Sequence, residues 1–210
     1  MMMGDLVLRP AEVNPVLQRL RARGIAVTAI HNHLLFERLR LMYMHYMGSG
    51  PAPRLAQDLR YALEASATPL ARPATTASGA VPGFAQQVET GLGHQGTVAG
   101  GVLVIGVPRA GAIQMDGATL PPAMGVAEAM NFQGVAPGRL AATGDFVLLS
   151  SEVEPVMDAL IAHGFTITAL HTHMLSETPH LYFMHYWDVA ATADVVAGLK
   201  AALARIAVAK

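Results

Sequence analysis

The chain repeats itself at a fixed spacing. Residues 4–63 align with residues 144–203 at a constant offset of 140 and without a gap, and many of the paired residues are identical. The stretch GDLVLRPAEVNPVLQRLRARGIAVTAIHNHLLFERLRLMYMHY stands against GDFVLLSSEVEPVMDALIAHGFTITALHTHMLSETPHLYFMHY. Self-similarity of this length indicates one structural unit that occurs twice, so we expect both copies to fold alike.

Each copy predicts the same order of elements. A short apolar strand (residues 4–8 and 144–149) precedes a helix with apolar residues at helical spacing, and Gly24 and Gly164 stand where such helices end. Two strands follow, at residues 25–34 and 41–47 and again at 165–174 and 181–187, and a helix closes each copy. The order β-α-β-β-α predicts an α+β fold of two tandem, pseudo-two-fold repeats, in which helices cover one face of antiparallel sheets.

The two copies differ in what precedes them. Residues 1–65 are the first predicted repeat unit, which lacks a leading strand segment, and residues 83–210 are the second, complete unit. The Pro-, Ala-, Thr- and Ser-rich residues 66–82 between them predict a linker. In the second unit a helix (83–92) and a strand (101–107) precede a turn-rich run, in which Asp116-Gly117 predicts a hairpin turn.

Composition excludes several classes of protein. The 210 residues are 52% hydrophobic and 14% charged, so the chain can bury a sizeable core and is not a disordered one. A net charge of −1 gives no electrostatic footprint for nucleic acid, and the absence of Cys excludes disulfides and thiolate metal sites. No apolar run is long enough to span a membrane and no signal peptide is recognisable, which predicts a cytoplasmic protein as sequenced, or an extracytoplasmic one if the true N-terminus lies upstream.

Six of the nine histidines fall at equivalent places in the two copies. They follow the pattern H-x-H-x3-E-x7-H and comprise His31, His33, His45, His171, His173 and His185. Side chains at i and i+2 of a strand point to the same face, so His31 and His33 are expected to project together. With a hairpin turn near Leu39, His45 would lie opposite His33 on that face, close enough for the imidazoles to share one ion.

The pattern predicts a metal site in each copy. Three histidines would be ligands, and Glu37 and Glu177 in the hairpins would act as a fourth ligand or as a catalytic base. The donor set does not distinguish zinc, iron, manganese, nickel or copper. Two other interpretations stay open, a buried hydrogen-bonded histidine network and a surface or pH-sensing role, because a duplication copies residues whether or not they are ligands.

The segments GDFVLLSSEVEPVMDAL, ITALHTHMLSE and LYFMHYWDV, with PPAMGVAEAMNFQ upstream, resemble the LppY/LpqO family of bacterial proteins. That family is named after mycobacterial lipoproteins and has no established reaction. The resemblance covers nearly the whole chain and implies two such units, each with a leading strand-rich segment. Here the hairpins read Glu37-Arg38-Leu39-Arg40 and Glu177-Thr178-Pro179-His180 where the family has E-S-P-R.

Three functional hypotheses follow from the residues. The first is a metal-binding protein, with catalysis left open, in which the second copy is favoured because its leading segment is complete. The second is a non-enzymatic small-molecule-binding or envelope-associated module, and the third is an interaction module with structural histidines. A homo-oligomer is a further expectation, because exposed sheet edges can pair between chains.

Overall fold

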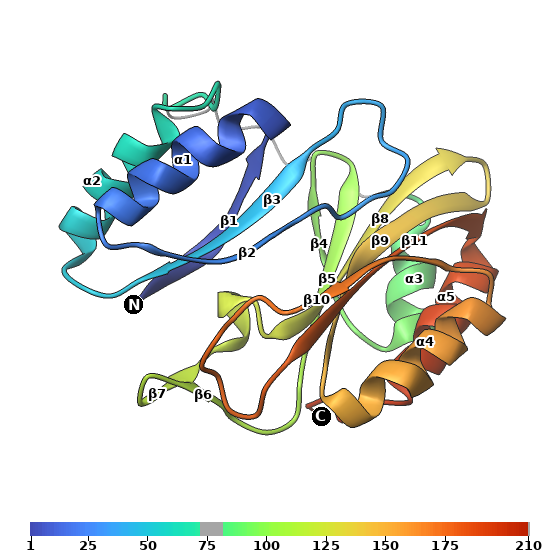
Figure 1. Cartoon of the computed structure of the whole chain (residues 1–210). Coiled ribbons are helices and arrows are strands. Elements are labelled where there is room, and N and C mark those ends of the chain that lie inside the picture. Colours follow the sequence, from blue (N-terminus) through green and yellow to red (C-terminus); the bar gives the residue numbers. More distant parts are fainter. Residues whose placement is uncertain (72–81, 210) are drawn as a thin grey trace. The chain divides into compact units, whose positions relative to one another are not determined.

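The computed structural model describes residues 1–71 and 82–209, which form two compact units (Figure 1). Most of the predicted linker, residues 72–81, lies outside the described residues. The first unit comprises β1 (Met2–Leu8), α1 (Pro10–Ala22), β2 (Ala26–His31), β3 (Met42–Gly48) and α2 (Ala52–Leu63).

The first unit is an antiparallel sheet of order β1-β3-β2 with α1 and α2 on one face (Figure 1). Its core joins Val16 and Leu20 of α1 to Met44 of β3. Glu12 sets the start of α1 by accepting a 2.8 Å hydrogen bond from the backbone N–H of Arg9. The helix is followed by Gly24 at φ 75°, a left-handed conformation that glycine adopts at little cost, as the sequence predicts.

The second unit has a larger sheet, of order β10-β11-β9-β8-β5-β4, and a separate two-stranded sheet β6-β7. Its elements are α3 (Ala85–Leu92), β4 (Thr97–Ala99), β5 (Val102–Pro108), β6 (Ile113–Met115), β7 (Ala118–Leu120), η1 (Pro122–Met124), β8 (Ala127–Ala136), β9 (Arg139–Leu148), η2 (Ser150–Glu152), α4 (Val153–Ala162), β10 (Thr166–His171), β11 (Tyr182–Ala191) and α5 (Thr192–Leu203). All pairings in this sheet are antiparallel.

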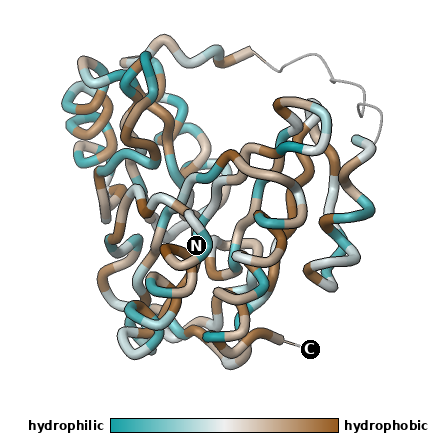
Figure 2. Tube along the Cα trace, turned by 90° about the vertical axis from the view of Figure 1, so that its right-hand side faces the viewer, coloured by the Kyte–Doolittle hydropathy of each residue, from teal (hydrophilic) through white to brown (hydrophobic). Residues whose placement is uncertain are grey.

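The core of the second unit lies between this sheet and α3, α4 and α5 (Figure 1). Met130, Phe146 and Tyr186 come from β8, β9 and β11 and pack against Val156 of α4 and Leu199 of α5. In Figure 2 the helices carry both hydrophobic and hydrophilic segments, as expected when one side of a helix rests on a sheet. The chain is therefore an α+β protein with antiparallel sheets, as predicted.

Residues that are 140 positions apart in the sequence lie in elements of the same order and pair in the same register. Asp5 lies opposite His45 between β1 and β3, and Asp145 lies opposite His185 between β9 and β11. The predicted hairpin turn at Asp116-Gly117 is present between β6 and β7, with φ values of 50° and 77°. Such paired positive φ values match the twist that a two-residue hairpin requires.

The prediction that His33 lies opposite His45 is wrong. Strand β2 ends at His31, so His33 is in the connection of residues 32–41, and the partner of His45 is Ala29. The register shifts between Val27 and Ala29, which leaves one extra residue in β2. A β-bulge of this kind shifts every later pairing by one residue. Counting residues outward from an assumed hairpin turn cannot reveal such a shift.

Candidate metal centre

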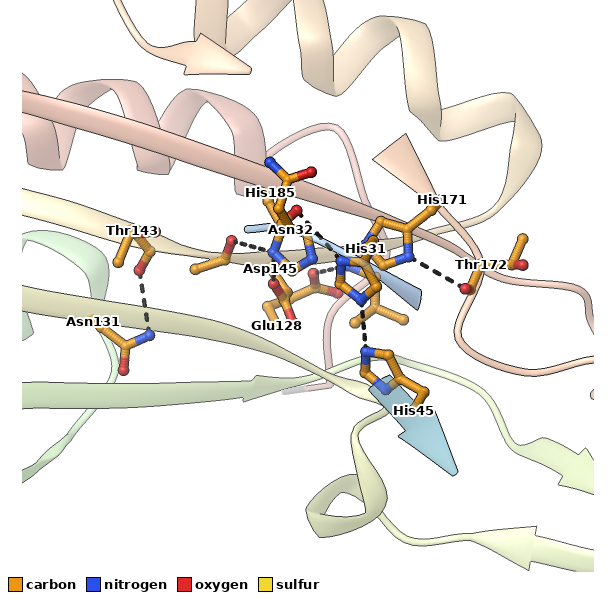
Figure 3. Close-up of polar contacts among 12 residues, drawn as sticks. His31, Asn32, His45, Glu128, Asn131, Thr143, Asp145, His171, Thr172 and His185 are labelled. Atoms are coloured by element: carbon orange, nitrogen blue, oxygen red, sulfur yellow. Dashed lines mark hydrogen bonds and ion pairs between the residues drawn. The ribbon is translucent and has the colours of Figure 1, made fainter. Parts of the chain in front are cut away.

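The first histidine cluster has one residue at the end of β2, one in the connection that follows it and one in the middle of β3. His31, His33 and His45 each offer a ring nitrogen, and these atoms all lie within 4.8 Å of one another. The Nε2 atoms of His31 and His45 are 2.8 Å apart, with ring centroids at 4.9 Å (Figure 3). The sequence prediction that these three residues gather is confirmed, although the register that brings them together differs from the one expected.

The two Nε2 atoms lie at hydrogen-bond distance, and their separation also suits a shared ion. Two nitrogens bound to one metal at ~2.0–2.1 Å, with about 90–109° between the bonds, lie about 2.8–3.4 Å apart. The Nδ1 atom of His31 is 3.4 Å from the backbone oxygen of Asn32, which favours the tautomer with the proton on Nδ1 and the lone pair on Nε2. His33 stacks on Tyr43 with ring centroids 3.5 Å apart, and this contact fixes the plane of its ring.

The second cluster occupies the equivalent place on β10 and β11. The ring nitrogens of His171, His173 and His185 lie within 4.8 Å of one another, and the rings of His171 and His185 have centroids 4.9 Å apart. His173 and His185 are buried, and His171 is half-buried. This cluster therefore offers three imidazole nitrogens, two of them on buried side chains.

Two contacts orient the imidazoles of the second cluster (Figure 3). The Nδ1 atom of His185 contacts the carboxylate of Asp145, directly opposite on β9. The Nδ1 atom of His171 is 3.2 Å from the backbone oxygen of Thr172. A histidine whose Nδ1–H is held by a carboxylate or a carbonyl presents its Nε2 lone pair in a fixed direction, which is the usual arrangement of a histidine ligand.

Burial keeps the ring of His171 able to bind a cation at neutral pH. Burial, and secondarily the charge of neighbouring His185, lowers the pKa of His171 to about 4. Its imidazole is thus neutral near pH 7, and only the neutral ring can bind a metal.

Glu37 and Glu177 lie in the connections after the histidine strands, and neither belongs to the groups whose ligand atoms converge within the described residues. One carboxylate oxygen of Glu177 accepts a 2.8 Å hydrogen bond from the backbone N–H of Leu181 and lies 2.8 Å from Nδ1 of His180. A carboxylate oxygen of Glu37 lies 4.0 Å from Nε of Arg40. The bonded oxygen of Glu177 thus holds its own loop, and the second carboxylate oxygen of each glutamate is buried without a hydrogen-bond partner among the described residues.

A model of one protein family matches most of the chain. The model described as a domain of unknown function, DUF1259, matches residues 1–65 and 86–205. The chain belongs to the DUF1259 family. No curated protein and no solved structure matches it. Across the described part of this DUF1259 protein, no helix is long and apolar enough to cross a membrane.

The sequence did not predict the charged residues that lie beside His185 or inside the second unit. Asp145 lies inside β9, and its contact with His185 follows only from the β9–β11 register. Arg109, Glu128 and Glu152 form a buried ionic group, in which the Arg109 guanidinium lies 2.8 Å from Glu152 and 3.9 Å from Glu128. Burial raises the pKa of Glu128 to about 8, although the neighbouring Arg109 opposes this shift. Nothing in the local sequence marks Glu128 as buried.

Proposed function

We propose that this protein is a metal-binding protein whose two histidine clusters each hold a divalent transition metal. The observation that carries the proposal is the convergence of three imidazole nitrogens at equivalent positions, His31, His33 and His45 and again His171, His173 and His185. Imidazole nitrogen is a ligand that zinc, copper, nickel, iron and manganese accept, with affinities that rise toward copper. We also propose that residues 4–63 and 144–203 are two copies of one structural unit. Within the DUF1259 family, we propose that the protein belongs to the LppY/LpqO group.

A metal held by His171, His173 and His185 would keep a coordination position for solvent or a small molecule. It would supply Lewis-acid chemistry there. The chain's own residues orient the ligands: Asp145 holds the ring of His185, and the carbonyl of Thr172 holds that of His171. Glu177 and Glu37 are the acid–base candidates, and that role requires the loop carboxylates to swing toward the histidines.

Metal content measured by inductively coupled plasma mass spectrometry tests the proposal. Purified protein is stripped with chelator, reconstituted with zinc, manganese, iron, nickel or copper in turn, and desalted. We expect stoichiometric metal in the wild type, and less after the pair of changes His171→Ala and His185→Ala or the pair His31→Ala and His45→Ala. The exposed His163→Ala is the matched control, because it removes an imidazole outside both clusters.

The variants also separate the competing functions. Wild-type protein that retains no metal under any of these conditions contradicts the proposal and favours the small-molecule-binding module. A large loss of stability in the cluster variants, without any metal in the wild type, favours structural histidines, because truncation leaves buried partners unpaired.

A further inference from the structure

A charged cleft lies at one end of the first unit, where α1 is followed by β2 and β3 is followed by α2 (Figure 1). Its volume of about 280 Å³ is close to the lower limit of small-molecule sites, ~300 Å³. We call it the Arg23–Arg54 cleft, after the two exposed cations in its wall. Its lining includes Arg23, Ile25, Ser49, Arg54, Leu55 and Asp58.

The charges in this cleft do not balance. Asp58 of α2 is buried, and its carboxylate oxygens lie 3.7 Å from Nε of Arg23 and 3.5 Å from Nε of Arg54. Both separations exceed those of a normal N–H···O hydrogen bond, and neither guanidinium donates a hydrogen bond to any of the described residues. One carboxylate therefore faces two guanidinium groups, and the cleft carries a net positive charge with unused N–H donors.

Arg23 is held in place by Tyr61 of α2. Its guanidinium carbon lies 4.3 Å from the centre of the Tyr61 ring, within the range of a cation–π contact. This contact restricts the position of the guanidinium without giving it an oxygen acceptor. The side chains of Ile25 and Leu55 are buried and supply apolar surface in the same cleft. The cleft thus combines a positioned cation with apolar surface.

The second unit has a different arrangement at the equivalent corner. His163, Asp194 and Gly198 stand 140 positions after Arg23, Arg54 and Asp58. A Cβ added at Gly198 would lie 2.5 Å from the ring of Phe165, so an aromatic side chain occupies the place that Asp58 has in the first unit. Both units fold in the same order of elements, so the fold does not require the two arginines and the buried carboxylate.

The second unit also shows that this corner stays accessible when further chain precedes the repeated elements. There α3 packs on α5 at Val196, since a Cβ added at Gly91 would lie 2.4 Å from that side chain. Two residues turn a helix by about 200°, so Val196 lies on the opposite side of α5 from Asp194 and Gly198. His163 and Asp194 accordingly remain exposed.

We propose that this cleft binds a small organic acid, whose carboxylate lies between the two guanidinium groups and whose apolar part lies on Ile25 and Leu55. A planar carboxylate matches the N–H fork of arginine and accepts two parallel hydrogen bonds from it. One bound carboxylate and Asp58 together neutralise the two arginines. A phosphate dianion would leave a net negative charge and bring its second charge close to Asp58, so a monocarboxylate fits better.

Saturation-transfer difference NMR with benzoate and hexanoate tests the site in the whole chain freed of metal, where no bound metal can take up the acids. We expect saturable binding of both acids, and binding about tenfold weaker or more for benzamide and hexanamide, which have similar shapes without the charge. Arg54→Gln should weaken binding of the acids about tenfold or more. The Arg54 side chain is 74% exposed, so this variant keeps the fold. Arg60→Gln, on the same helix and outside the cleft lining, is the matched control.

The buried carboxylate tests the charge argument separately. Wild-type protein should bind inorganic phosphate less tightly than benzoate. Asp58→Asn removes the negative charge that opposes a dianion, so this variant should lose the preference for benzoate.

Backbone amide signals locate the bound acid without any variant. Titration of ¹⁵N-labelled wild type with benzoate should shift the signals of Ser49 and Gly50, which line the cleft, and leave those of β10 unchanged. Absence of binding by both acids, equal affinity in Arg54→Gln, or unchanged signals of Ser49 and Gly50 overturns the proposal. Phosphate that binds to the wild type more tightly than benzoate also overturns it, because the ligand is then not a carboxylate.

Discussion

His185 and Asp145 face each other across β11 and β9, and the imidazole Nδ1 of His185 contacts the carboxylate of Asp145. The two residues are directly opposed in the strand register, so their side chains must lie on the same face of the sheet. The pair fixes which nitrogen of His185 is presented to the rest of the cluster. A carboxylate that orients a histidine in this way is a recurrent support of protein metal sites.

Asp145→Asn should therefore weaken the second metal site without removing a ligand. An asparagine side chain cannot replace the negative charge that orients and polarises the ring of His185. We expect metal affinity to fall roughly 10–100-fold, measured by competition with a chromophoric chelator. Asp158→Asn, at an exposed position on α4, is the matched control. Unchanged affinity in Asp145→Asn would show that the contact between Asp145 and His185 has only a structural role.

Metal-free protein should lose stability in mildly acidic solution because of His171. Burial lowers the pKa of His171 to about 4, whereas an unfolded chain binds that proton near pH 6.5. Between these values the unfolded state holds more protons, so the free energy of unfolding decreases as the pH falls. Urea denaturation of chelator-treated protein at pH 7.5, 5.5 and 4.5 measures the trend. His171→Gln should flatten it, and an equal slope in this variant would assign the trend to other groups.

Glu128 should give the opposite dependence on pH. Burial raises its pKa to about 8, so the folded state keeps a proton that the unfolded state loses near pH 4.5. Stability from this group is complete below pH 4.5 and is lost as the pH rises through 8. Glu128→Gln, which imitates the protonated acid while Arg109 keeps its 2.8 Å contact with Glu152, should be relatively more stable than the wild type at pH 9. The exposed Glu154→Gln serves as control, and unfolding by urea at pH 5 and 9 is the measurement.

The fold was more predictable from the sequence than the site. Gly24, Gly164 and the Asp116-Gly117 turn each ended or joined an element where the sequence indicated, because glycine and turn residues act through local backbone conformation. The gathering of His31 and His45 was also predictable, since strand alternation restricts where their side chains point, whereas His33 joins them from the connection after β2. The role of Asp145 was not, because its contact with His185 depends on the register of strands far apart in the sequence.

Gly144 and Gly4 offer a last test, because they occupy equivalent positions with different surroundings. A Cβ added at Gly144 would lie 1.8 Å from the backbone oxygen of Ala129 on β8, whereas one added at Gly4 would meet no atom closer than the Tyr46 hydroxyl at 2.9 Å. A backbone oxygen in a paired strand cannot move aside, but a side-chain hydroxyl can shift. We expect Gly144→Ala to destabilise the protein by about 3 kcal/mol or more and Gly4→Ala by less, measured by urea denaturation. Equal losses would mean that β8 can separate from β9 at little cost.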